Sequence, residues 1–159
     1  MDKILQILHE NARTTDAEIA SRLGISPEKV RESIAGYEKS GVIRGYQALV
    51  NPEAAGDTDV HAIIELRIRP EREGGFDRLA KRIGRFPEVS SMFLVSGGFD
   101  LLLFVRGRNL QEVASFVSGK LAPLDGVLST ATHFMLKTYK DNDVMMEVEE
   151  HDERLQVTP

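Results

Sequence analysis

The chain has 159 residues, 42% of them hydrophobic and 28% charged, which is typical of a soluble globular protein with one domain or two small ones. It has no cysteine, which excludes disulfides, thiolate metal sites and cysteine nucleophiles, and no apolar run long enough to cross a membrane. The net charge of −5 lies in residues 140–159, so any contact with nucleic acid must come from local clusters of cations. The N-terminus is too polar for a signal peptide, and we expect a cytoplasmic location.

The first predicted element is a short helix over residues 2–12, with an apolar stripe of Ile4, Leu5 and Leu8. Residues 15–43 then read TDAEIASRLGISPEKVRESIAGYEKSGVI. A capping box, a glycine and a Ser-Pro pair mark two helices joined by a tight turn: Thr15 with Glu18, Gly24, and Ser26 with Pro27. So short a turn forces the helices to cross steeply, which predicts a helix-turn-helix whose second helix fits the major groove of DNA.

Apolar residues continue beyond Gly41, where residues 42–50 predict a strand or short hairpin that ends at Asn51 and Pro52. Residues 1–51 are therefore predicted to form one winged helix-turn-helix domain. Residues 52–58, PEAAGDT, lack apolar periodicity and contain the turn formers Pro, Gly and Asp. We expect a linker and a domain boundary in this segment.

Residues 59–139 predict a second domain, so the fold class is α+β. Strands are expected over residues 60–68, 89–95, 101–105 and 127–139, and amphipathic helices over about 76–86 and 110–121. The order β-α-β-β-α-β is the ferredoxin-like arrangement, in which both helices cover one face of an antiparallel sheet. Ile63, Phe93, Val95 and Leu102 would then populate the uncovered face, and an exposed apolar face predicts at least a dimer.

Three blocks in this order, EIASRLGISPEKV, GVIRGYQALVNP and SGGFDLLLFV, resemble the Lrp/AsnC family of bacterial and archaeal regulators over roughly residues 2–139. The resemblance implies a winged helix-turn-helix joined to a ligand-sensing domain of ferredoxin-like fold. It also implies double-stranded DNA as a partner and a small effector, an amino acid, bound between sensing domains. A homodimer that assembles into an octamer or larger is implied too, with no cofactor and no membrane partner.

For the DNA interface, the motif and the resemblance together predict contacts from Thr15, Ser26, Lys29, Arg31 and Arg44. The alternative is that Lys29 and Arg31 are ordinary solvated charges. Related regulators often carry more arginine in the middle of this helix, where this chain has Glu28, Glu32, Ala35 and Gly36. Carboxylates repel phosphate, although they accept hydrogen bonds from cytosine, so we expect modest affinity per copy and compensation by an oligomer.

The loop over residues 96–100, SGGFD, is the second predicted site. Its simple interpretation is a hairpin turn in which Asp100 hydrogen-bonds to the backbone. The resemblance adds that this loop lines the effector pocket, where backbone N–H groups would bind the carboxylate of an amino acid and Asp100 its ammonium. With hydroxyls from the last strand, the predicted effector site consists of Ser96, Gly97, Gly98, Phe99, Asp100, Thr130 and Thr132.

The acidic tail, residues 140–159, carries Val144, Met146 and Val148 in alternation with other residues, which is consistent with an added strand or with a disordered solvating tail. The histidines are scattered and no nucleophile elbow or phosphate loop occurs, so we predict no catalysis and no metal site. The sequence thus favours a sequence-specific transcriptional regulator modulated by an amino acid. The alternative is a ligand-sensing or assembly module with weak DNA binding that acts through a partner subunit.

Overall fold

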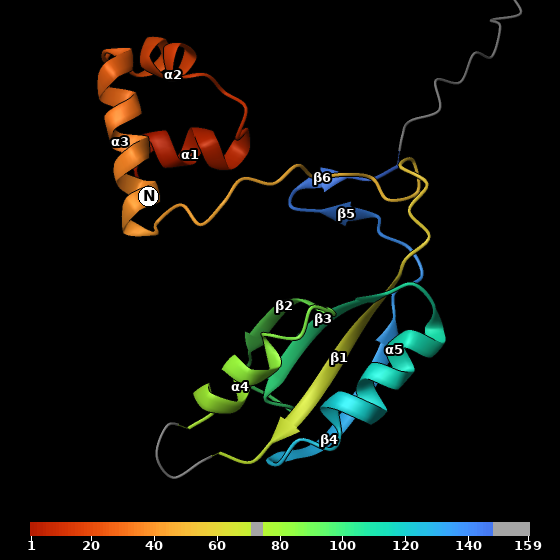
Figure 1. The fold of residues 1–159 in the computed structure, drawn as a ribbon. Coiled ribbons are helices and arrows are strands. Elements are labelled where there is room, and N and C mark those ends of the chain that lie inside the picture. The colour runs from red at the N-terminus through yellow and green to blue at the C-terminus, as the bar shows by residue number, and fades with distance from the viewer. Residues whose placement is uncertain (71–74, 148–159) are drawn as a thin grey trace, which may run out of the picture. The chain divides into compact units, whose positions relative to one another are not determined.

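The chain divides into two compact units, Met1–Leu49 and Val50–Pro159, each with its own hydrophobic core. The computed structural model describes residues 1–70 and 75–147 (Figure 1). The boundary between the units lies close to the division that the sequence predicts after residue 51.

Three helices form the first unit: α1 Lys3–Glu10, α2 Asp16–Leu23 and α3 Pro27–Ser40. Their common core consists of Ile4, Ile19, Ala20 and Val30, against which Ile34 and Tyr37 are packed. Helix α1 is shorter than the predicted span because Asp2 is its N-cap, with a side-chain oxygen that accepts from the N–H of Ile4 at 2.8 Å.

The predicted caps of the helix-turn-helix are confirmed. Thr15 and Glu18 form a complete capping box at the start of α2, and Ser26 caps α3 by accepting from the N–H of Lys29 at 3.3 Å. Gly24 and Gly41 end the two helices with φ of 66° and 75°, a left-handed conformation that favours glycine. Local sequence signals therefore determine where both helices begin and end.

The strand predicted over residues 42–50 is absent, so this part of the prediction is wrong. The N–H of Ile43 donates to the carbonyl of Tyr37 at 3.1 Å, and the Tyr46 hydroxyl donates to Glu38 at 2.9 Å. Within residues 1–70 and 75–147, however, no strand pairs with this segment, and Val42, Tyr46 and Val50 are more than half exposed. Apolar β-formers alone are not sufficient, because a strand also needs a neighbour that completes its hydrogen-bond ladder.

A four-stranded antiparallel sheet in the order β2-β3-β1-β4 is the centre of the second unit. Its strands are β1 Val60–Ile68, β2 Val89–Leu94, β3 Leu101–Gly107 and β4 Val127–Phe134. Helix α4 Asp77–Ile83 follows β1, and α5 Leu110–Phe116, continued by the π-helical turn η1 Val117–Leu121, follows β3. The order β-α-β-β-α-β confirms the predicted ferredoxin-like fold.

Both helices lie over the same face of this sheet (Figure 1). The core between them consists of alternate strand residues, such as Ile64, Leu66 and Leu103, with Ile83 of α4 and Phe116 of α5. The period of two that these apolar residues follow in β1 and β3 places the residues between them on the opposite, uncovered face.

Strand β4 ends at Phe134, five residues before the predicted end, because Phe134 is the last residue that pairs with β1. The chain then forms a hairpin of β5 Lys140–Asp141 and β6 Val144–Met145, whose turn residues Asn142 and Asp143 have φ of 42° and 67°. Met146 is buried, and its carbonyl accepts from the side-chain amide of Asn51. The described part of the tail thus forms an ordered hairpin whose two short strands pair with each other, while Val148 and the rest lie outside the described residues.

The segment predicted as a linker, residues 52–58, begins with a turn. The N–H groups of Ala55 and Asp57 donate to the carbonyls of Asn51 and Pro52 at 3.0 and 2.9 Å. Because Asn51 also contacts Met146, this turn lies against the C-terminal hairpin inside the second unit.

Candidate functional site

The uncovered face of the sheet is predominantly apolar at its centre. Strand register places Ile63 opposite Phe104 and His133, and Phe93 opposite Leu102. The rings of Phe93 and Phe104 meet edge to face, with centroids 6.1 Å apart. Ile63, Phe93 and Leu102 thus lie on the face that the sequence predicted for them, and Val95 follows β2, where its N–H donates to the Asp100 carbonyl.

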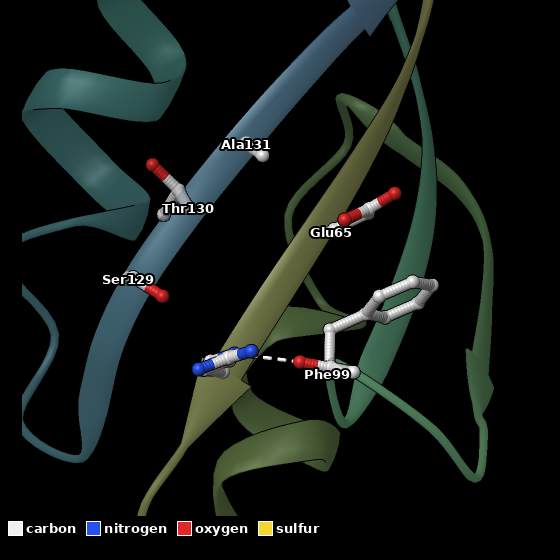
Figure 2. Close-up of a pocket in the computed structure, with 7 residues that line it drawn as sticks. Glu65, Phe99, Ser129, Thr130 and Ala131 are labelled. Atoms are coloured by element: carbon white, nitrogen blue, oxygen red, sulfur yellow. Dashed lines mark hydrogen bonds between the residues drawn. The ribbon is translucent and has the colours of Figure 1, made fainter.

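One edge of this face contains a pocket of about 260 Å³ (Figure 2). It lies between β1, β4 and the loop that precedes β3. Its lining residues are Glu65, Arg67, Gly98, Phe99, Ser129, Thr130 and Ala131. The pocket therefore combines a carboxylate, a guanidinium and an aromatic ring, which are the groups needed to bind a small zwitterion with an apolar side chain.

The loop owes its shape to three hydrogen bonds and one glycine. The Nε–H of Arg67 donates to the carbonyl of Gly98 at 2.6 Å, as the dashed line in Figure 2 marks. The carboxylate of Asp100 accepts from the N–H of Ile68 at 2.8 Å, and the Asp100 N–H donates to the Leu66 carbonyl at 2.8 Å. Gly97 has φ of 142°, which side-chain-bearing residues rarely adopt.

These contacts favour the hairpin interpretation of Asp100, whose side chain holds the turn and does not line the pocket. Of the predicted effector residues, the structure brings Gly98, Phe99 and Thr130 to the pocket and leaves out Ser96, Gly97 and Asp100. Thr132 is left out as well, because it lies opposite Ile64 on the face that the helices cover. Thr130 lies opposite Leu66, and Figure 2 shows its side chain on the other side of β4 from Ser129 and Ala131.

Sequence reasoning missed Glu65 and Arg67, which are not among the predicted site residues. Their spacing of two, which places both side chains on the uncovered face of β1, was the available signal. Glu65 also lies 3.3 Å from Nε2 of His133 on β4, so it belongs both to the pocket and to the apolar face beside it.

In the first unit, most of the predicted DNA contacts make hydrogen bonds within the unit. Thr15 donates from its backbone N–H and its hydroxyl to Glu18, at 2.8 Å each, and these bonds lower the pKa of the Glu18 carboxyl. The Nε of Arg31 lies 3.3 Å from Asp16 at the start of α2. Arg44 is exposed beyond the end of α3.

A second pocket, of about 370 Å³, brings cations together on this unit. Its lining includes Lys3 of α1, Arg22 of α2 and Lys29 of α3, together with Asp2 and Ser33. The sequence predicted Lys29 but not Lys3 or Arg22, because nothing in the order of the residues indicates that α1 and α2 meet here. This is a local cluster of the kind that a neutral domain needs in order to attract phosphate.

No described helix is long and apolar enough to cross a bilayer. Within the described ranges, no group of three or more His, Asp or Glu is arranged to hold a metal ion.

Comparison with known proteins identifies both units. Residues 61–145 match the family model of the Lrp/AsnC ligand binding domain, and residues 3–44 match that of a winged helix-turn-helix DNA-binding domain. The HTH-type transcriptional regulator YugG of Bacillus subtilis is 42% identical, covering 99% of this chain and 95% of its own. The leucine-responsive regulatory protein of Haemophilus influenzae is 31% identical, covering 91% and 86%.

Among solved structures, the transcriptional regulator NMB0573 of Neisseria meningitidis, in complex with L-Met, is 31% identical with a TM-score of 0.69. The match covers 89% of this chain and 93% of that one. With a helix-turn-helix in the first unit and a ligand-binding fold in the second, the chain belongs to the Lrp/AsnC family of DNA-binding transcriptional regulators.

Proposed function

We propose that this regulator responds to a free amino acid bound in the pocket between β1, β4 and the loop over residues 96–100. The observation that carries the proposal is that one small pocket is lined by both Glu65 and Arg67. An amino acid presents a carboxylate and an ammonium on the same carbon, so a site for it needs one cation and one anion close together.

In this proposal each side chain would have a distinct role. Arg67 uses Nε for the Gly98 carbonyl, and a guanidinium has four further N–H donors with which to bind a carboxylate. Glu65 would accept from the ammonium, and the ring of Phe99 lies where an apolar side chain of the effector would pack. This assignment replaces Asp100, whose carboxylate is engaged with the backbone of Ile68. The complex of NMB0573 with L-Met supports an amino acid as the class of effector.

We also propose that the uncovered sheet face is the surface through which two copies form a homodimer, and that dimers assemble further, into an octamer or larger. This face has an apolar centre that neither of the described helices covers, formed by Ile63, Phe93, Leu102 and Phe104. Contiguous apolar surface of this kind is unfavourable in water and favours self-association with two-fold symmetry. A dimer would place the pocket beside the interface, since Glu65 belongs to both.

A second candidate, a sensing or assembly module that binds DNA weakly and acts through a partner subunit, rests on one observation. The exposed side of α3 carries Glu28 and Glu32, which repel phosphate. In this case the effector would still bind, but the isolated oligomer would have little affinity for any operator.

Fluorescence anisotropy against the DNA upstream of its own gene, over a salt series, separates these candidates. We expect affinity that falls steeply with salt and exceeds that for scrambled DNA. Adding amino acids singly, with L-methionine first, should shift the affinity for at least one of them. The shift should be lost in Glu65→Gln and Arg67→Met variants that retain DNA binding. A folded oligomer that binds no DNA at low salt would favour the second candidate, and an unchanged response in both variants would exclude this pocket.

A further inference from the structure

The outward side of α3 is a single stripe of exposed residues. Val30, Ile34 and Tyr37 turn towards the core of the first unit. Residues at spacings of four, three and four lie on the opposite side and are exposed: Glu28, Glu32, Ala35 and Lys39. In a helix-turn-helix this side of the second helix is the one that enters the major groove, so this stripe faces the base edges.

Glu32 lies in the middle of this stripe, with its side chain exposed. It makes no hydrogen bond or ion pair with any residue of the described ranges. Glu28, one turn earlier, lies in the first turn of α3, where a carboxylate is favoured by the helix dipole. Glu32 lies beyond the reach of that effect, and the like charge of Glu28 four residues before it is unfavourable.

Gly36, one turn after Glu32, also has no explanation inside the chain. Its φ is ordinary for a helix, and a Cβ at this position would meet no atom within 4 Å. Glycine destabilises a helix interior relative to alanine, so alanine at this position would make α3 more stable. The missing side chain lowers the surface next to Glu32 and allows another molecule to approach the helix backbone closely.

Cations lie on both sides of the stripe. Lys29 borders it on the side of the pocket that also contains Lys3 and Arg22. Arg31 is two residues after Lys29, roughly 200° round the helix, and therefore borders the stripe on its other side. Its Nε lies 3.3 Å from the carboxylate of Asp16 at the start of α2. Phosphates on the two strands of a duplex would meet these cations, while the bases between them would meet Glu32.

We propose that Glu32 is a specificity-determining residue, whose carboxylate accepts a hydrogen bond from an exocyclic amino group in the major groove of each operator half-site. This inference rests on the DNA-binding function of the family. A carboxylate is an acceptor only, and the major-groove donors are the N4 amine of cytosine and the N6 amine of adenine. Guanine and thymine present acceptors at the same edge and would be disfavoured.

The test begins with selection of duplexes from a random pool by the full-length wild-type protein, followed by anisotropy with the selected duplex. At one position of each half-site, replacing the preferred cytosine or adenine by guanine or thymine should weaken binding about 10-fold. Removing only the exocyclic amine should cause the same loss. The analogue for this step carries hydrogen in place of the amine: a 2-pyrimidinone if cytosine was selected, or an unsubstituted purine if adenine was selected.

In Glu32→Ala this preference should fall to less than about 2-fold, while preferences at other positions and the salt dependence persist. Glu10→Gln, which changes the charge of an exposed residue on α1, is the matched control and should keep the wild-type pattern. Tight binding by Glu32→Ala with every wild-type preference intact would overturn the inference and leave the regulator function standing. A wild-type protein that selects no sequence at all would overturn both.

Discussion

Arg67 and Gly98 are 31 residues apart in the chain, yet the Nε–H of Arg67 donates to the Gly98 carbonyl at 2.6 Å. This bond joins β1 to the loop before β3, at the point where both line the proposed effector pocket. The same guanidinium therefore positions the loop and lines the pocket in which we propose that the effector binds. A planar fork with several donors suits this double role better than a single ammonium.

Replacing Arg67 by lysine should weaken amino-acid binding although the charge is retained. A lysine ammonium cannot hold the Gly98 carbonyl and a bidentate carboxylate at once, so we expect a loss of about tenfold, or ~1.4 kcal/mol. This loss of affinity is measured by isothermal titration calorimetry, with the amino acid that shifts DNA affinity as the ligand. Arg69→Lys, an exposed residue just beyond β1, is the control and should leave the affinity within twofold.

Gly97 should tolerate alanine poorly, while its neighbour Gly98 tolerates it well. The φ of 142° at Gly97 lies in a region that alanine rarely adopts, so Gly97→Ala should cost about 1–3 kcal/mol of stability. Gly98 has no such φ, and a Cβ there would meet nothing within 4 Å. Urea denaturation of both variants compares them, and equal stability would show that this turn relaxes freely.

The capping box of α2 should make the stability of the first unit depend on pH. The backbone N–H and then the hydroxyl of Thr15 lower the pKa of Glu18. A lowered folded-state pKa means that the ionised carboxylate stabilises the fold above its unfolded pKa, about 4.3, and that this contribution is lost as pH falls through the folded-state pKa. We expect Thr15→Ala to cost about 1 kcal/mol at pH 7 and less at pH 3. Amide hydrogen exchange in α2 follows the difference, and a cost that is constant over this range would contradict the prediction.

Lys120 and Glu88 form a pair that links η1 to the residue before β2. Burial raises the pKa of Glu88, but the hydrogen bonds it accepts, from Lys120 and the backbone, and the charge of Lys120 outweigh this effect and leave the pKa below its ordinary value. Lys120→Met should raise that pKa and cost about 1 kcal/mol at pH 7, because the pair is partly exposed.

The cost should vanish as pH falls through the folded-state pKa of Glu88, since a protonated carboxyl no longer needs the cation. Thermal unfolding at pH 7 and 3.5 measures the destabilisation caused by Lys120→Met. NMR titration of the Glu88 carboxyl measures the change in its pKa directly. Lys120→Arg keeps the charge and should behave like wild type, so an equal loss in this variant would point to packing on Phe86 and Phe116 instead.

A charge on the uncovered sheet face should dissociate the proposed dimer. Phe93 is 53% exposed on that face, and Leu110, at the start of α5, is 52% exposed away from it. We expect Phe93→Glu to reduce the molar mass measured by light scattering to half of the wild-type value or less, because a carboxylate would have to be buried without a partner. Leu110→Glu, with the same chemistry and exposure, should not. Dissociation by Leu110→Glu alone would place the interface elsewhere.

The two helices of the helix-turn-helix could be predicted from the sequence because their signals are local. Thr15 with Glu18, Gly24 and Ser26 each act within four residues, so reading the chain in order suffices. The same holds for β1, where alternation of period two identified the buried residues. The strand predicted over residues 42–50 does not form, because a strand also needs a partner strand. The residues of the segment itself do not indicate whether such a partner is present.

The pocket was decided by tertiary structure alone. Glu65 and Arg67 acquire a role only because β1 pairs with β4, which brings Ser129 beside them, and because the loop folds back onto Arg67. Pairing with the buried Ile64 places Thr132 on the covered face, although the residue before it, Ala131, lines the pocket. The sequence by itself determined the helices, the four strands of the sheet and which of their faces are apolar, because those depend on neighbours in the chain. The fold decided which polar side chains meet, because that depends on hydrogen bonds between residues tens of positions apart.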